Sequence, residues 1–147
     1  MKIWNQIPIE EIEERLIAIP SFFKFISPHP YYDLGAPYGA EKEIWKLREE
    51  VVKRLIKVNE YLKLRNSSFH LLLYDSWRPI EVQKFMFNRA FCLECERLDI
   101  EASVDDIKRY PTIKQKVEKF WAYPSFDKRF PPPHSTGGAL DITLADK

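Results

Sequence analysis

FHLLLYDSWRPIEVQKFMF, residues 69–87, sets out a strand, a polar turn and a helix in succession. Residues 69–74 are apolar on both alternating faces apart from His70, which is typical of a short strand in the interior of a sheet. Residues 80–98 place apolar side chains close to one helical face, with Pro79 at a favourable first-turn position. We therefore expect an interior strand that ends at Asp75 and a helix that follows the turn.

An amphipathic helix is predicted on the N-terminal side of this strand. Its apolar positions recur at intervals of three and four and form a stripe that a sheet must cover: Ile44, Leu47, Val51, Leu55, Val58 and Leu62. A shorter helix is predicted over residues 9–18, where Ile9, Ile12 and Leu16 have the same spacing and Pro20 ends the pattern. Residues 27–39 carry three prolines and two glycines, so we expect an irregular loop there.

A capping box is predicted on the C-terminal side of the helix over residues 80–98. Ser103 and Asp106 have its spacing and start a short helix, which Pro111 interrupts before the helical pattern resumes over residues 113–121. Residues 124–133 are expected to be a loop. Residues 139–144 alternate as in a strand, with Leu140, Ile142 and Leu144 on the core face and Asp141 on the other face. Long helices with a few short strands indicate an α+β fold, a single domain of residues 1–147 with long helices packed on a small antiparallel sheet.

Composition and charge exclude several classes of protein. With 45% hydrophobic and 14% aromatic residues the chain can bury a core, which excludes a disordered tail. A net charge of +1 gives no basic field for nucleic-acid phosphates, so we expect a small partner. Pro8 and several glutamates interrupt the first apolar residues, which favours a cytoplasmic protein without an export signal or membrane span. Cys92 and Cys95 lack the second pair of a zinc ribbon, so we expect ordinary reduced thiols.

One candidate site lies in HSTGGALD, residues 134–141, where His134 and Asp141 flank two glycines symmetrically. A tight reversal at the glycines brings the two side chains together, and a β-branched residue at Gly138 should disrupt it. Neutral imidazole and carboxylate are zinc ligands, so one hypothesis is that the turn presents both to a single cation. The alternative is a hairpin in which the histidine and the aspartate only hydrogen-bond to each other.

A second candidate is Arg78, which lies in YDSWRP directly after the predicted interior strand. A guanidinium held at the end of a sheet is suited to bind a carboxylate bidentately or to stabilise an oxyanion, with Asp75 to orient it. The alternative is a local salt bridge between Asp75 and Arg78 that organises the turn.

These two motifs, YDSWRPIEVQ (74–83) and HSTGGALDITL (134–144), together resemble the metal-dependent D-alanyl-D-alanine dipeptidases of the vancomycin-resistance type. PYYDLGAPYG (30–39) and LREEVVKRL (47–55) are similar to the N-terminal half of that family. The resemblance implies a zinc D,D-peptidase-like fold, a Zn²⁺ cofactor and a small D,D-dipeptide as substrate. It also implies that His134 and Asp141 are the first two zinc ligands, and that Arg78 stabilises the tetrahedral intermediate during hydrolysis.

The sequence also departs from the family. Members continue past the aspartate to a Glu-x-x-His-like segment that supplies the general base and the third zinc ligand, whereas six residues follow Asp141 here. His29, in the proline-rich loop, and His70, on the predicted strand, are expected to lie away from the site. The prediction is therefore a C-terminally truncated zinc dipeptidase. A non-catalytic relative that binds a small peptide or metal without turnover is the alternative, and a carboxypeptidase for longer cell-wall peptides is disfavoured because no export signal is visible.

Overall fold

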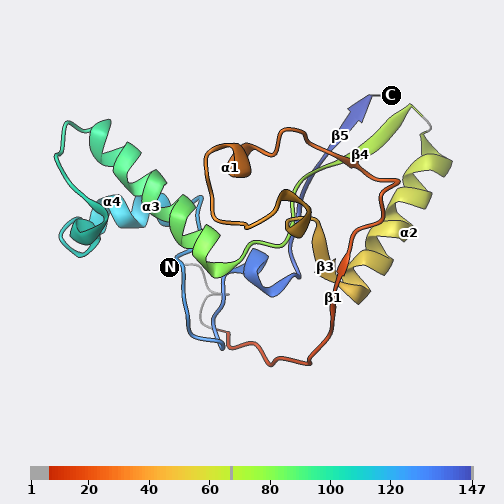
Figure 1. Cartoon of the computed structure of the whole chain (residues 1–147), viewed down its shortest axis with the longest axis horizontal. Helices are drawn as coiled ribbons and strands as arrows, with labels where there is room; N and C mark the ends of the chain where they lie inside the picture. Colours follow the sequence, from red (N-terminus) through yellow and green to blue (C-terminus); the bar gives the residue numbers. More distant parts are fainter. Residues whose placement is uncertain (1–6, 67, 147) are drawn as a thin grey trace.

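The computed structural model describes residues 7–66 and 68–146 and confirms the α+β class (Figure 1). Its helices are α1 (Pro30–Asp33), α2 (Glu49–Arg65), α3 (Ile80–Glu96) and α4 (Pro111–Glu118), with 3₁₀ segments η2 (Glu41–Glu43), η3 (Val104–Lys108) and η4 (Pro133–Thr136). Its strands are β1 (Leu16–Ala18), β2 (Lys24–Phe25), β3 (Lys46–Arg48), β4 (Phe69–Asp75) and β5 (Asp141–Asp146). Figure 1 shows α2 beside β4 at one end of the molecule and α3 with α4 at the other.

The strand β4 is central in a three-stranded sheet of order β2-β4-β5. β5 runs antiparallel to β4 and places Asp141 opposite Asp75, whereas β2 runs parallel to β4. A separate antiparallel sheet pairs β1 with β3. The predicted interior strand is thus confirmed, and the predicted antiparallel pairing holds for β4–β5 and β1–β3 but not for β2–β4. Because β4 has a neighbour on each edge, its last residue is held beside the start of β5.

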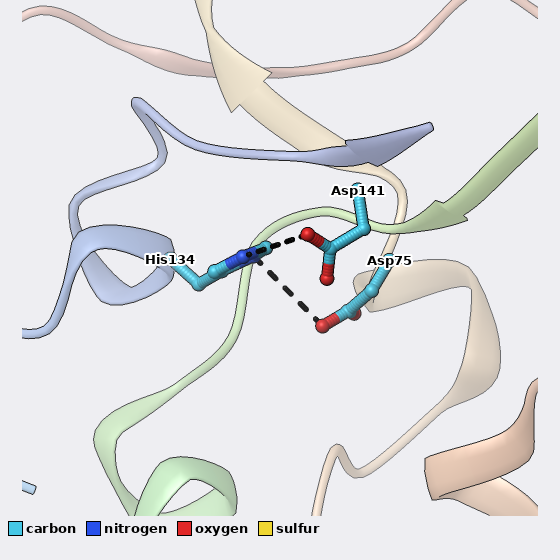
Figure 2. Close-up of side chains that lie close together, drawn as sticks. All are labelled: Asp75, His134 and Asp141. Carbon is cyan, nitrogen blue, oxygen red and sulfur yellow. Dashed lines mark ion pairs between the residues drawn. The ribbon is translucent and has the colours of Figure 1, made fainter. Parts of the chain in front are cut away.

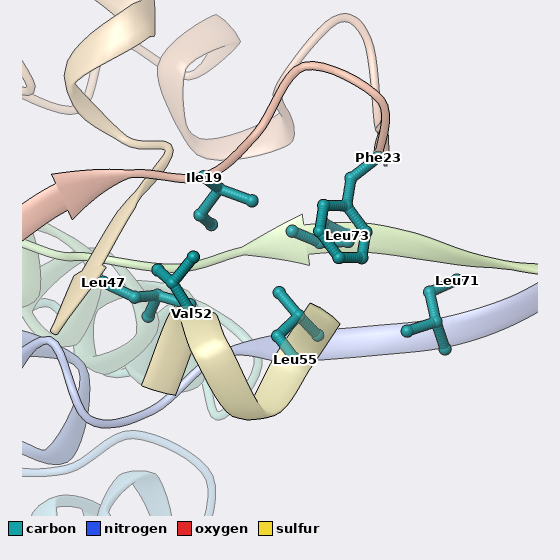
Figure 3. Close-up of a cluster of buried hydrophobic side chains, with 7 residues drawn as sticks. All are labelled: Ile19, Phe23, Leu47, Val52, Leu55, Leu71 and Leu73. Carbon is teal, nitrogen blue, oxygen red and sulfur yellow. The ribbon is translucent and has the colours of Figure 1, made fainter. Parts of the chain in front are cut away.

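The main core lies between α2 and the face of β4 that carries Leu71 and Leu73 (Figure 3). Leu73 is fully buried, and burial of such a side chain stabilises a fold by about 1.5–3 kcal/mol. The cluster consists of Ile19, Phe23, Leu47, Val52, Leu55, Leu71 and Leu73. A second cluster joins α3 to α4: Phe87, Phe91, Cys95, Ile113 and Val117. The strand and the helix on either side of the YDSWRP turn are therefore each anchored in a core of their own.

The predicted helix over residues 9–18 is wrong. Residues 9–15 have no regular secondary structure, and Leu16–Ala18 form β1. Glu13 has a φ of 54°, which no right-handed helix accommodates. Ile9 and Ile12 are 44% and 76% exposed, so the predicted apolar stripe meets no surface to cover. A helix this short gains most of its stability from packing, and here Leu16 and Ile17 are half-buried as part of the strand that pairs with β3.

The predicted long helix is confirmed as α2, but it begins at Glu49 and buries a different face. Ile44 and Leu47 are fully buried in the segment before the helix, and Leu47 belongs to β3. Within α2 the buried positions are Val52, Leu55 and Asn59, whereas Val58 is 50% exposed. The apolar stripe therefore combines two elements, because the pairing of β3 with β1 takes residues 46–48 out of the helix.

The helices that follow β4 agree with the sequence more closely. α3 begins at the predicted residue and ends at Glu96, shortly before the predicted end at residue 98, and Pro79 precedes its first residue instead of lying in the first turn. The capping box of Ser103 and Asp106 is present at η3, and Pro111 begins α4. The loop at residues 27–39 is irregular except for the short α1.

The predicted core face of β5 is wrong, since Ile142 and Leu144 are 44% and 54% exposed. β5 lies at the edge of its sheet, and α2 packs on β4.

Cys92 and Cys95 form no disulfide, as predicted. In residues 7–66 and 68–146, no helix combines the length and the apolar character needed to cross a bilayer. Residues 1–6, on which part of the export-signal prediction rests, lie outside the described residues.

Candidate metal and arginine site

A turn anchored to β3 brings His134 and Asp141 together. The segment η4, which contains His134, ends at Gly137 with a left-handed φ of 74°. Arg48, the last residue of β3, donates its backbone N–H to Gly137 O at 2.9 Å and its Nε–H to Thr136 O at 2.8 Å. The chain then enters β5 at Asp141. As a result His134 Nε2 lies 3.5 Å from Asp141 Oδ1, and the predicted reversal is present (Figure 2).

Gly137, and not Gly138, is the position where the backbone requires glycine. A Cβ atom at Gly137 would overlap Leu16 Cδ2 of β1, in addition to the strain of its positive φ. Gly138 has no positive φ, and its N–H donates to Thr136 Oγ1 at 2.9 Å. The strain that the sequence predicted at Gly138 is thus displaced by one residue, because the αL conformation occurs directly at the end of η4.

The backbone of the YDSWRP turn orients the imidazole of His134. Its Nδ1 lies 2.8 Å from the carbonyl oxygen of Ser76, which only accepts hydrogen bonds, so Nδ1 carries a proton. In the neutral ring Nε2 is then the lone-pair nitrogen, and it faces Asp141. The backbone N–H of Arg78 donates to His134 O at 3.2 Å. Two segments that are far apart in the sequence therefore form one site through backbone hydrogen bonds.

Arg78 is buried beside this pair, with its guanidinium held on several sides. Nε donates to Asp75 Oδ2 at 3.0 Å, Nη2 donates to the same oxygen, and Nη1 donates to Gln83 Oε1 at 2.8 Å. The guanidinium carbon lies 5.3 Å and 5.2 Å from the ring centres of Tyr31 and Trp121, which is within the range of a cation–π contact. The plane of the guanidinium is thus fixed by a carboxylate, an amide and two rings.

The charge of Arg78 also reaches the histidine–aspartate pair. Nη2 lies 3.8 Å from Asp141 Oδ2. The two hypotheses for Arg78 are therefore compatible, because the same side chain forms the local salt bridge with Asp75 and points toward Asp141. The side chain of Asp141 is 49% exposed, whereas that of Arg78 is 6% exposed, so the site opens to solvent on the Asp141 side.

Asp75, the last residue of β4, holds Arg78 in place. The residue is fully buried; its Oδ1 accepts from Tyr38 Oη at 3.1 Å and lies 3.3 Å from His29 Nε2, while its Oδ2 accepts both bonds from Arg78. Burial raises the pKa of this carboxyl group, but His29 and the charge of Arg78 more than offset that effect, so the pKa lies below its ordinary value. Asp75 is therefore an ionised anchor with partners on both oxygens.

Asp75, His134 and Asp141 are the one group of three candidate metal ligands that residues 7–66 and 68–146 bring together, with ligand atoms within 4.8 Å of one another. Figure 2 shows the three side chains converging from β4, η4 and β5. Asp75 Oδ2 lies 3.8 Å from His134 Nδ1, which is the protonated nitrogen, and both Asp75 oxygens already accept hydrogen bonds. The atoms best suited to a cation are therefore Nε2 of His134 and the carboxylate of Asp141.

The separation of these two atoms fits one zinc ion. Ligands at about 2.0–2.1 Å from a tetrahedral Zn²⁺ lie about 3.3 Å apart. The 3.5 Å between His134 Nε2 and Asp141 Oδ1 is close to that value. The hydrogen bond from Nδ1 to a carbonyl is also the usual support for a histidine ligand, because it fixes the ring orientation and the tautomer.

His29 is the residue that sequence reasoning missed. The prediction that it lies away from the site is wrong, since its fully buried ring contacts Asp75. His70 does lie elsewhere, near the start of β4 and opposite Ala145. Pro30 after His29 is a signal for a helix start with a capping side chain at His29, and the structure has that cap. Nothing in the local sequence indicates the contact with Asp75, which depends on how the loop folds back over β4.

The comparisons with known proteins agree with the motifs. The chain is 37% identical to a curated protein from Synechocystis sp. named D-alanyl-D-alanine dipeptidase, over an alignment of 147 residues that covers 99% of this chain. The chain spans 59% of the length of that relative. No protein-family profile and no solved structure matches the chain. The resemblance predicted from the two motifs is thus confirmed over nearly the whole chain.

Proposed function

Because this chain is a relative of the D-alanyl-D-alanine dipeptidases, we propose that it carries the metal-binding and charge-stabilising part of a site that hydrolyses D-Ala-D-Ala or a related small dipeptide. One observation carries the proposal. His134 Nε2 faces Asp141 at 3.5 Å, with the guanidinium of Arg78 beside the same aspartate at 3.8 Å. A metal-ligand pair next to a buried cation is an arrangement suited to amide hydrolysis, since it serves both activation of water and stabilisation of an oxyanion.

In this proposal His134 and Asp141 hold a Zn²⁺ ion. When bound, zinc supplies Lewis-acid polarisation of the scissile carbonyl and activation of a water molecule. The chain contributes the orientation of the ligands. Ser76 O fixes the tautomer of His134, and the turn at Gly137 sets the distance between His134 and Asp141.

Arg78 binds the negative charge that develops on the carbonyl oxygen during hydrolysis. Its guanidinium is held before the reaction begins, which is why it provides stabilisation without reorganisation. Asp75 and Gln83 occupy Nε, Nη1 and one side of Nη2, so the remaining N–H of Nη2 is directed toward Asp141 and the open side of the site. The substrate approaches from that side, where Asp141 is half-exposed.

A non-catalytic protein that binds a small peptide or metal is the second candidate. It is favoured by the state of Asp75, whose oxygens are taken by Tyr38, His29 and Arg78. Within residues 7–66 and 68–146 the metal cluster then offers two available protein ligands, and ligand number largely governs zinc affinity. The cytoplasmic location, the single domain of residues 1–147 and the absence of a nucleic-acid partner stay predictions from the sequence.

The test uses the purified chain with added zinc and D-Ala-D-Ala, and it measures the release of D-alanine. We expect His134→Ala and Asp141→Asn to abolish turnover, whereas Asp127→Asn, which changes an exposed aspartate paired with Arg129, leaves it unchanged. Zinc binding that depends on His134 without any release of D-alanine supports the non-catalytic candidate. Turnover that survives His134→Ala contradicts the proposed site.

A further inference from the structure

His29 is a fully buried ionisable side chain to which the proposed chemistry gives no task. Its ring lies edge-on, 5.4 Å from each of the rings of Tyr31, Tyr38 and Trp45. Burial of an imidazole among apolar groups is unfavourable unless its nitrogens find polar partners. Both nitrogens of His29 face polar groups, and these groups belong to different parts of the chain.

The partners determine where the ring carries its proton. Nδ1 accepts the backbone N–H of Tyr32 at 3.2 Å and so caps the N-terminus of α1. A nitrogen that accepts a hydrogen bond holds no proton, so the neutral ring is protonated on Nε2. Nε2 lies 3.3 Å from Asp75 Oδ1, which is an electrostatic contact, and it forms no aligned hydrogen bond within residues 7–66 and 68–146. His29 is therefore a neutral donor directed at Asp75.

Asp75 links His29 to Arg78, because it contacts His29 with one carboxylate oxygen and Arg78 with the other. Oδ1 lies between His29 Nε2 and Tyr38 Oη, and Oδ2 accepts from Nε and Nη2 of Arg78. A carboxylate with partners on both oxygens cannot rotate without breaking some of these contacts, and such networks stabilise one arrangement cooperatively. The guanidinium follows the plane of the carboxylate, and this keeps Arg78 Nη2 at 3.8 Å from Asp141 Oδ2.

We propose that His29 is a positioning residue, which fixes the carboxylate of Asp75 through its Nε2–H and thereby fixes the direction in which Arg78 presents its guanidinium beside Asp141. The proposal deepens the proposed function and rests on it only for the task of Arg78 in hydrolysis. The connection from His29 through Asp75 to Arg78 is testable without any turnover.

Two substitutions separate this role from the capping of α1. His29→Asn keeps a side chain that is well suited to cap a helix but is too short to reach Asp75. His29→Gln places an amide nitrogen near the position of Nε2 but is a poor cap. If His29 positions Arg78, the glutamine variant retains the wild-type behaviour and the asparagine variant loses it. If His29 serves only to cap α1, the order is reversed.

The first measurement is NMR spectroscopy of the ¹⁵N-labelled chain. In the wild type we expect His29 to be protonated on Nε2 and the Nε–H of Arg78 to exchange slowly with solvent. The Arg78 signal should shift and lose its protection in His29→Asn, and should keep both properties in His29→Gln. His70→Asn, on β4 away from Asp75, is the control and leaves the signal unchanged. Protonation of His29 on Nδ1, or an unaltered Arg78 signal in His29→Asn, overturns the proposal.

The second measurement is turnover of D-Ala-D-Ala by the zinc-loaded variants. We expect His29→Asn to lower kcat roughly ten- to a hundredfold with little change in KM, because a displaced group weakens transition-state contacts more than substrate binding. His29→Gln should restore most of the rate, and an equal kcat in His29→Asn and the wild type contradicts the proposal. If the wild type releases no D-alanine, the proposed function fails, and the Arg78 signal alone decides the role of His29.

Discussion

Arg78 contributes to the fold as well as to the site, since its substitution leaves the buried carboxylate of Asp75 without its cation. We expect Arg78→Ala to lower the free energy of unfolding by about 3–5 kcal/mol, the usual effect of breaking a buried ion pair. We also expect it to lower turnover roughly a hundred- to a thousandfold, as for a lost oxyanion donor. Denaturant unfolding and D-alanine release measure the two effects separately.

Arg78→Lys refines this prediction because it keeps the positive charge and removes the planar fork. One ammonium group cannot replace the bonds of Arg78 to both Asp75 and Gln83, so turnover should stay impaired. Arg97→Lys directly after α3, which alters an exposed arginine paired with Glu94, is the matched control and should behave as the wild type. Full activity of Arg78→Lys would mean that only charge is needed at this position.

The lowered pKa of Asp75 predicts how the free energy of unfolding depends on pH. His29 and the charge of Arg78 hold its pKa below the ordinary 3.8 despite burial. A carboxyl group whose pKa is lowered on folding stabilises the native state above its unfolded pKa, and this contribution disappears as the pH falls through the folded pKa. The free energy of unfolding of the wild type should therefore exceed that of Asp75→Asn by the largest amount at neutral pH. This difference should become smaller below about pH 3.9. Urea unfolding at several pH values measures it, and a difference independent of pH contradicts the assignment.

At the scale of elements, the turn from η4 into β5 depends on one glycine. Gly137 has a φ of 74°, and a Cβ there meets Leu16 of β1. Because a left-handed conformation costs an ordinary residue about 1–2 kcal/mol, Gly137→Ala should lower the melting temperature and weaken zinc binding. Gly138→Ala is the matched control, since Gly138 has no positive φ and a Cβ there comes near only Thr136 Oγ1, at 3.0 Å. Equal effects of the two substitutions would show that the turn is not tight.

The short strands depend on each other in the same way. β1 and β3 have three residues each, and neither is stable without its partner. Their pairing also places Arg48 where it binds the backbone of Thr136 and Gly137. The failed prediction of a helix over residues 9–18 follows from this, because local apolar spacing contains no information about a strand that comes thirty residues later.

For the whole molecule, metal binding should couple distant segments of the chain. The two proposed ligands lie in η4 and β5, and they are supported by Asp75 at the end of β4 and by Ser76 directly after it. A ligand that binds only the folded state stabilises it. Zinc at a hundred times its Kd should therefore raise the free energy of unfolding by about 2.7 kcal/mol, and the melting temperature should rise with it. His134→Ala should abolish the shift, and His70→Ala should retain it. Loss of the shift in His70→Ala would mean that another set of ligands binds the metal.

The sequence by itself determined the elements whose signals are local. The interior strand that ends at Asp75, the helix after YDSWRP, the capping box of Ser103 and the turn between His134 and Asp141 each follow from residues that are close together in the chain. Apolar alternation, helical periodicity and glycine placement act over a few residues, so they can be identified without a structure. The two motifs were also sufficient to indicate the similarity to a D-alanyl-D-alanine dipeptidase that the comparison found.

Only the tertiary structure decided how these pieces meet. In the folded chain Asp75 lies beside the histidine–aspartate pair, and Tyr38 and His29 contact its Oδ1. The fold also places the positive φ at Gly137. It also began α2 at Glu49 and left Ile142 and Leu144 of β5, which were predicted to face the core, exposed to solvent. The physical reason is the same in each case. Long-range pairing and the exclusion of water from buried polar groups depend on neighbours that are distant in the sequence, and no local pattern specifies those neighbours.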